Sequence, residues 1–331
     1  MSKTIFNIVS QKGGCGKTTV ALLIAKICKY LGKSSLILDL DFTGTSMKDI
    51  FADTSNDKFN VFDSPSSSSG TKLEELLTPG PFDISHKAWT EKITESILPI
   101  PDSDLSVRID CIPSNTGPKS YRKVSPFLEI EAESGFLAKK SRQLILHLWN
   151  KYGVFILDNG PGITGLSQGL MEPSFENAFQ EKDLKFINLH LTACDRQDII
   201  QTFKSYFDYY LQLRKEILRG TGKDEISVPK DRETLINWVK RNIIIMNKIS
   251  DPSEYKDRFV QQLKSKFDPD TFISFPEPLT ILDSSKASVR FEESWPGLKD
   301  FGPAFESAKP SPDSAANFFD FVRANVMELI K

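Results

Sequence analysis

A glycine-rich segment, KGGCGKTT at residues 12–19, lies directly between an apolar run at residues 5–9 and an amphipathic run at residues 20–31. This order predicts a strand, a tight turn and a helix, which is the arrangement of a phosphate-binding loop. Glycines in the turn accept backbone angles that other residues resist, and they leave room for an anion beside consecutive N–H groups. The residues expected to contact a nucleotide through this loop are Gly13, Gly14, Cys15, Gly16, Lys17, Thr18 and Thr19.

Three side chains near this loop carry the chemistry expected of it. Lys17 is placed to reach the β- and γ-phosphates, and the hydroxyl of Thr18 is placed to ligate Mg²⁺. The ordinary pattern G-x-x-x-x-G-K-[ST] requires a glycine at position 11, where this chain has Gln11 followed by a second lysine, Lys12. A lysine at the start of the turn is poorly placed for its own phosphate and well placed for one held by a second copy. Lys12 and Lys17 are therefore candidate catalytic residues of a nucleotide-sandwich homodimer.

Patterns typical of buried strands alternate with helical patterns along the chain. This alternation predicts an α/β fold with a doubly wound, mostly parallel sheet flanked by helices. The expected strands are at residues 5–9, 35–40, 107–112, 154–157, 186–192 and 242–246. The expected helices are at residues 19–30, 71–77, 89–97, 141–152, 197–218 and 314–330.

The composition supports one large domain. A chain of 331 residues with 39% hydrophobic residues buries a large core, so we expect one P-loop domain over residues 1–331 with a variable insert at about 51–140. The stretch DSPSSSSG at residues 63–70 is small and polar, which predicts a flexible loop. No apolar run has the length of a membrane span, no leader pattern opens the chain, and the four cysteines lack metal-site spacing. A reducing, cytoplasmic setting is expected.

Acidic residues stand where two of the predicted strands end. In open α/β sheets the ligand lies beyond the carboxyl ends of the strands, so Asp39, Asp41 and Asp158 are expected to meet a nucleotide on the loop. Mg²⁺ prefers oxygen ligands and keeps several waters, which makes Thr18, Asp39 and Asp158 candidate metal-site residues. Asp41 is expected to lie nearer the γ-phosphate and to orient the attacking water. Asp39 has an alternative role, in which it only braces the loop.

Two further segments are candidates for nucleotide contact. Gly160-Pro161-Gly162 is a turn able to bring a backbone N–H, that of Gly162, to the γ-phosphate and so sense hydrolysis, although a plain loop is the alternative. Asn247 follows the strand pattern NIIIM, and its amide offers both a donor and an acceptor to a base edge. The register N-K-I-S-D is one residue too long for guanine recognition, which favours adenine.

The distribution of charged residues bears on whether the chain binds nucleic acid or a membrane. The net charge of −2 gives no global attraction to nucleic acid or anionic lipid. Residues 201–266 hold 14 Lys and Arg against 9 Asp and Glu, an excess that serves either to contact DNA or simply as a solvated helix face. The expected helix at residues 314–330 has an apolar stripe without the basic face that membrane attachment requires, so packing on the sheet is favoured.

Four motifs in order carry a family resemblance: QKGGCGKTT, LILDLDFTG, YGVFILDNGPG and IIIMNKI. Together they resemble the ParA/MinD family of deviant Walker-A P-loop ATPases, with a match from residue 3 to about residue 250. The resemblance implies an ATP-dependent dimer in which Lys12 acts across the interface, Asp158 has the Walker-B role, Asn247 contacts adenine and Pro276 belongs to a base-side loop. It also implies ATP and Mg²⁺ as cofactors.

Two places depart from the family pattern. The proline-glutamine usual after the second acid of LILDLD is here Phe42-Thr43, and the usual proline pair after Asp158 is here Asn159-Gly160-Pro161. These departures leave the branch of the family open.

The leading hypothesis is a ParA-like partition or positioning ATPase with weak intrinsic hydrolysis, an activating partner protein and non-specific DNA binding. Alternatives are a MinD-like regulator that cycles on membranes, a client or metal-cluster carrier, and an ATP-dependent ligase with a second pocket in the insert.

Overall fold

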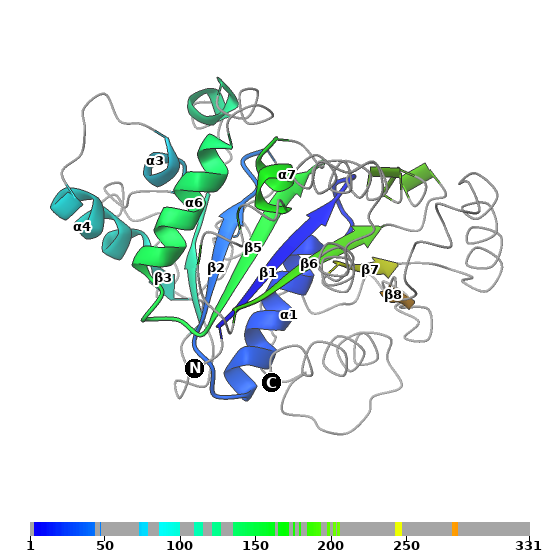
Figure 1. Cartoon of the computed structure of the whole chain (residues 1–331), viewed down its shortest axis with the longest axis horizontal. Coiled ribbons are helices and arrows are strands. Elements are labelled where there is room, and N and C mark those ends of the chain that lie inside the picture. The colour runs from blue at the N-terminus through cyan, green and yellow to red at the C-terminus, as the bar shows by residue number, and fades with distance from the viewer. Residues whose placement is uncertain are drawn as a thin grey trace, which may run out of the picture.

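The computed structural model describes residues 3–43, 47, 73–78, 86–99, 109–114, 121–126, 135–162, 165–171, 175, 179, 184–192, 197–198, 201–202, 204–205, 242–246 and 280–283. The described strands form one eight-stranded sheet in the order β3-β4-β2-β5-β1-β6-β7-β8, which runs across the centre of the molecule (Figure 1). Every neighbouring pair is parallel except β3 with β4. The predicted doubly wound α/β architecture is therefore confirmed.

The strands are β1 (Lys3–Ser10), β2 (Ser35–Leu40), β3 (Leu98–Pro99), β4 (Ile109–Ile112), β5 (Val154–Pro161), β6 (Leu184–Thr192), β7 (Asn242–Met246) and β8 (Thr280–Asp283). The helices are α1 (Lys17–Tyr30), α3 (Leu73–Leu77), α4 (His86–Ser96), α6 (Phe136–His147) and α7 (Gly165–Met171).

Two hydrophobic clusters cover the two faces of the sheet, as the helices on either side of it in Figure 1 indicate. One cluster joins α1 to the side chains of β1 and β5 typified by Phe6 and Ile156. The other joins α3, α6 and α7 to the alternate side chains, typified by Ile5 and Phe155. Strands buried on both faces explain why their sequences are almost continuously apolar.

Most predicted elements are present with ends that differ by a few residues, and the largest differences are in α6 and β5. The predicted helix at 141–152 is displaced, because α6 begins after Gly135, which has a left-handed φ of 57°, and ends at His147. The carbonyls of Trp149 and Tyr152 instead accept hydrogen bonds from Lys3 Nζ at 2.6 and 2.7 Å. The strand predicted at 154–157 is β5, which continues through Pro161, so Asp158 lies inside the strand rather than at its end.

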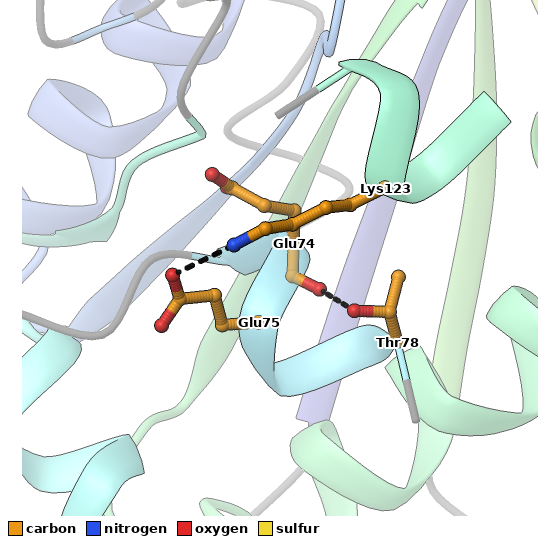
Figure 2. A network of polar contacts seen from close by, with 4 residues as sticks. All are labelled: Glu74, Glu75, Thr78 and Lys123. Atoms are coloured by element: carbon orange, nitrogen blue, oxygen red, sulfur yellow. Dashed lines mark hydrogen bonds and ion pairs between the residues drawn. The ribbon is translucent and has the colours of Figure 1, made fainter. Parts of the chain in front are cut away.

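The insert contributes short helices that pack on the α6 face. The N–H of Leu73 donates to the Pro113 carbonyl at 3.2 Å, which joins α3 to the end of β4. Figure 2 shows an ion pair of 3.3 Å between Glu75 of α3 and Lys123 of the helical residues 121–126. Both side chains are about half exposed, so this pair positions the segment and contributes little to stability.

Three regions of the predictions lie outside the described residues: the Ser-rich stretch at 63–70, the helix at 314–330, and most of the basic segment 201–266. Residues 197–198, 201–202 and 204–205 are helical, as expected for the helix at 197–218. Within the described ranges, no helix has both the length and the apolar character needed to cross a bilayer.

Candidate nucleotide site

The predicted phosphate loop connects the carboxyl end of β1 to the amino end of α1. Gly14 and Gly16 have φ values of 73° and 90°, a left-handed conformation that L-residues rarely adopt. Gly13 does not have a left-handed φ, and a Cβ there would meet nothing within 4 Å. Neither the backbone conformation nor the surrounding protein atoms therefore require glycine at position 13, contrary to the prediction from the sequence. Gly16 caps α1 without any side-chain hydrogen bond, which leaves the first N–H groups of the helix for an anion.

Lys17 is held at the end of β1. Its side chain is only 6% exposed, and its Nζ donates to Ser10 Oγ at 3.0 Å. The Ser10 hydroxyl in turn donates to the Lys12 carbonyl at 2.7 Å. The ammonium group is thereby positioned beside the loop that it is expected to serve, and Lys12 begins that loop with a partly exposed side chain.

Cys15 and Gln11 join the loop to the helical segment after β6. The Cys15 thiol is buried, lies 3.6 Å from Asp198 Oδ2, and has its pKa raised by burial and by the Asp198 charge. The Gln11 amide donates to Ser205 Oγ at 2.5 Å. The Cys15 side chain thus faces the protein interior, so a phosphate contact at this position would involve its backbone N–H.

Asp39 is a fully buried carboxylate that accepts hydrogen bonds from the backbone of its own loop and of a neighbouring one. The donors are the N–H groups of Asp41 (3.3 Å), Met47 (2.9 Å) and Ser114 (3.2 Å). Burial and the neighbouring Asp158 raise the pKa of Asp39 to about 8. These contacts favour the bracing role for Asp39, since its lone pairs organise the loops around the site.

Asp158 lies opposite Asp39 in the parallel register of β2 and β5. Both of its carboxylate oxygens are buried and have no hydrogen-bond partner in the described part of the chain. Burial raises the pKa of Asp158 to about 7, although Thr18 and Lys17 lie near enough to favour the charged form. Buried anionic oxygens without partners are costly, and a cation bound there removes the cost.

These residues fit Mg²⁺. Asp158 and the Thr18 hydroxyl would supply oxygen ligands, and a magnesium ion ordinarily takes its remaining ligands from water and phosphate. In the described ranges no group of three or more His, Cys, Asp or Glu side chains is arranged to hold a metal by protein ligands alone. A site of this kind therefore suits a metal that arrives with its nucleotide.

Asp41 follows β2 and faces the end of β5. Its Oδ1 accepts hydrogen bonds from both the N–H and the hydroxyl of Thr43, each at 3.0 Å. A Cβ on Gly160 would lie 3.3 Å from the same oxygen. The main-chain carbonyl of Asp41 accepts a hydrogen bond from the Ser114 hydroxyl at 2.8 Å. The acid expected to orient water is thus held by its own loop and by Ser114, with Gly160 of β5 close beside it.

The segment after Asp158 is joined to β1 and to α7. The Gly162 N–H donates to the Ser10 carbonyl at 2.8 Å, with Gly162 at a φ of 92°, and the Ser167 hydroxyl donates to the Gly162 carbonyl at 3.2 Å. A phosphate contact by this N–H would replace its bond to Ser10. A small pocket of about 50 Å³, open to solvent, lies beside it, lined by Leu40, Phe42, Thr43, Asn159, Gly160, Pro161, Gly162, Leu166 and Ser167.

The structure brings the predicted loop residues, including Thr19 at the start of α1, to one edge of the sheet with the three acids and Gly162. Asn247 and Pro276 lie outside the described residues. Sequence reasoning missed Ser10, Thr43 and Ser114, which hold Lys17 and Asp41. A hydroxyl residue beside a predicted strand end was the only signal for them.

Comparisons with known proteins agree with this geometry. Residues 1–73 match the family model ParA, described as NUBPL iron-transfer P-loop NTPase. No curated protein sequence matches the chain at a significant level.

Solved structures extend the likeness to the whole fold. The cell division ATPase MinD of Pyrococcus furiosus is 15% identical, with 99% of this chain and 100% of that chain covered and a TM-score of 0.51. A Borrelia burgdorferi B31 protein described as a putative plasmid partition protein, solved with AMPPNP bound, is 14% identical, with 99% of each chain covered and a TM-score of 0.51. The family match over residues 1–73 and the shared fold support the resemblance inferred from the motifs: the chain has the P-loop NTPase fold of MinD and of the plasmid partition protein.

Proposed function

We propose that this protein is a Mg²⁺-dependent ATPase of the ParA type, which forms a homodimer around ATP and dissociates after hydrolysis. The observation that carries the proposal is Asp158, whose two buried carboxylate oxygens lack partners among the described residues and lie near Thr18 and Lys17. A phosphate loop faced by such an acid is suited to a nucleoside triphosphate with its metal.

Each residue of the site has a role in this proposal. The loop N–H groups and Lys17 bind the phosphates, while Thr18 and Asp158 hold Mg²⁺, and Asp39 braces the loops around them. When bound, Mg²⁺ supplies positive charge that offsets charge on the β- and γ-phosphates. Asp41 orients the attacking water. The N–H of Gly162 gives up its hydrogen bond to the Ser10 carbonyl and donates to the γ-phosphate instead, so this segment changes its contacts on hydrolysis.

Lys12 gives the proposal its dimeric character. It begins the loop rather than following the glycines, and its side chain is partly exposed. In the proposed dimer each Lys12 reaches the phosphates bound by the other subunit. Asn247 and Pro276 are proposed to contact the adenine.

The basic excess at residues 201–266 supports non-specific DNA binding by the ATP-bound dimer, with a partner protein that stimulates hydrolysis. This assigns the protein to partition or positioning of a cargo on DNA, in a cytoplasmic setting. Membrane cycling is the less favoured hypothesis.

The test compares ATP turnover, dimerisation by light scattering and DNA binding at low salt for the wild type and three variants. Lys17→Ala is expected to lose ATP binding, Lys12→Ala to bind ATP without dimerising, and Asp41→Ala to accumulate as an ATP-bound dimer. A wild type that stays monomeric with ATP, or a dimer that forms equally well without nucleotide, would contradict the sandwich.

The DNA step has its own variants. Replacing Arg214 and Arg219 with alanine is expected to weaken ATP-dependent DNA binding and to leave ATP turnover unchanged. A wild type that dimerises with ATP but ignores DNA at low salt would remove DNA as the matrix while keeping the ATPase.

Iron transfer is a second candidate, because the matching family model carries that description. The described cysteines Cys15, Cys28 and Cys111 are buried and unbridged, which does not suit a cluster shared between two subunits. Anaerobic reconstitution with iron and sulfide decides the matter. A stoichiometric cluster with visible absorbance, lost on substitution of Cys194, would favour the carrier.

A further inference from the structure

The two departures from the family pattern meet at one side chain. Phe42-Thr43 follows Asp41 directly, and Asn159-Gly160-Pro161 ends β5 beside it. Both stretches line the same pocket, and Thr43 and Gly160 each approach Asp41 Oδ1. Residues that differ from the pattern in sequence therefore act on the same carboxylate oxygen in space.

The main chain of Asp41 is fixed independently of Thr43. Its N–H donates to Asp39 Oδ1 at 3.3 Å, and its carbonyl accepts from Ser114 Oγ at 2.8 Å. With the backbone held by buried neighbours, the remaining freedom of Asp41 is rotation of its side chain. That rotation decides where the carboxylate stands relative to a bound phosphate.

Thr43 restrains this rotation. Its N–H and its Oγ1 both donate to Asp41 Oδ1 at 3.0 Å, so one oxygen of the carboxylate is held by two donors of the same residue. A glutamine at position 43, as in the family pattern, has a backbone N–H but no hydroxyl on Cβ, and so supplies only the first of these donors. Hydrogen bonds to a charged acceptor are among the stronger ones and fix orientation as well as distance.

Gly160 of β5 lies beside the same carboxylate and leaves room for it. A Cβ at this position would lie 3.3 Å from Asp41 Oδ1 and 3.7 Å from Asp41 Cα, and the first of these distances is closer than most Cβ contacts. Asn159 anchors the backbone just before Gly160, since its Nδ2 donates to Asn7 Oδ1 at 2.7 Å and to the Ile8 carbonyl at 2.9 Å. A side chain at residue 160 would therefore require the Asp41 carboxylate to move by a few tenths of an ångström.

We propose that Thr43 is a positioning residue for hydrolysis, which acts by orienting the Asp41 carboxylate against Gly160. This inference rests on the proposed ATPase function and on the water-orienting role of Asp41. The hydrogen bonds of Thr43 within the described residues run to Asp41 and not to the phosphate loop or Lys17, so its effect is expected on turnover rather than on nucleotide affinity.

The test measures kcat and KM for Mg-ATP in the full chain, with mant-ATP affinity as a check on the loop. Thr43→Val keeps the shape and removes the hydroxyl, so kcat is expected to fall roughly ten- to hundredfold, as for a misplaced catalytic group, with KM and mant-ATP affinity within about twofold. Thr43→Ser retains the donor and is expected to recover most of the loss. Gly160→Ala crowds Oδ1 and is expected to lower kcat in the same way.

Thr94→Val is the matched control, because Thr94 is also exposed and its hydroxyl also donates a hydrogen bond within its own segment, to the Thr90 carbonyl in α4. It is expected to leave kcat and KM unchanged. Wild-type-like kcat in Thr43→Val, a change confined to KM, or equal losses in the Val and Ser variants would overturn the positioning role. A wild type without ATP turnover would instead overturn the proposed function, and the positioning role with it.

Discussion

Neighbouring glycines of the phosphate loop differ in what their backbone requires. Gly14 has a φ of 73°, whereas Gly13 does not lie in the left-handed range and has open space where a Cβ would stand. Gly14→Ala is therefore expected to lower the free energy of unfolding by about 1–2 kcal/mol, and Gly13→Ala to change it by less than about 0.5 kcal/mol. Urea unfolding without nucleotide measures both. Equal losses would show that the loop conformation does not set the cost.

His190 makes stability depend on pH at the level of one residue. It is fully buried beside Asn242, its Nε2 lying 2.9 Å from Asn242 Oδ1, and burial lowers its pKa from 6.5 to about 4. Well above pH 6.5 the residue is neutral in both the folded and the unfolded chain. As the pH falls from 6.5 toward 4 the unfolded chain takes up a proton that the folded chain does not, so stability is lost over that window.

His190→Gln removes the imidazole that takes up this proton and keeps a neutral polar side chain at the position. Between about pH 7.5 and about pH 5, the unfolding free energy of the wild type is expected to fall by about 2 kcal/mol more than that of the variant. The buried acids titrate in both proteins and cancel in the difference. Parallel pH profiles from urea unfolding would contradict a buried neutral histidine.

At the scale of elements, a line of buried amides joins three strands of the sheet. Asn159 of β5 donates to Asn7 of β1 at 2.7 Å, and Asn7 donates to Asn188 of β6 at 2.8 Å, all three being buried. Asn7→Leu removes the Asn7 side chain from two buried amides, of which Asn159 keeps its bond to the Ile8 carbonyl, and is expected to cost about 2–4 kcal/mol.

The pair Asn7→Leu and Asn188→Leu tests whether this line acts as a unit. Because the double variant removes both partners of one bond, its loss is expected to fall short of the sum of the single losses by about 1 kcal/mol or more. Urea unfolding of the four proteins closes the cycle. Additive losses would mean that the three strands are held independently of these amides.

Element by element, the sequence predicted what depends on local pattern. The apolar runs that became β1, β2, β5 and β6 were found because burial on both faces leaves them few polar positions. The strand β3 has only two residues and exists by pairing with β4, and α7 contains two glycines, so neither has a local signal.

The candidate site also has a part that the local sequence predicted and a part that depends on the folded structure. The loop and its acids are contiguous in sequence with predicted strands and were predicted, whereas the contact between Ser114 and Asp41 joins residues 73 positions apart and depends on the sheet order. The approach of Thr43 and Gly160 to Asp41 also depends on two segments that meet only after folding.

For the whole molecule, metal and nucleotide are expected to stabilise the fold together. A ligand present at about 100 times its Kd adds about 2.7 kcal/mol to the folded state, which raises the Tm. Mg-ATP is expected to raise the Tm of the wild type, and EDTA to remove the part that needs metal. Thermal unfolding followed by circular dichroism measures both effects.

Asp158→Asn should lose the metal-dependent part of the shift and keep the part due to ATP alone, because the amide preserves shape without charge. Glu75→Gln, on the exposed surface of α3, is the matched control and should respond to metal as the wild type does. If the Asp158→Asn protein kept the full metal-dependent rise in Tm, the metal would not be bound by Asp158.

The order of the strands also governs when the protein becomes competent during synthesis. β1 ends at Ser10, yet its neighbours in the sheet, β5 and β6, begin much later in the chain, at Val154 and Leu184. At roughly 5–20 residues per second the ribosome needs on the order of ten to forty seconds to supply them. Throughout that interval the apolar side chains of β1 lack the two strands that flank it in the folded sheet. The phosphate loop is thus translated well before the two strands that flank β1 in the finished sheet.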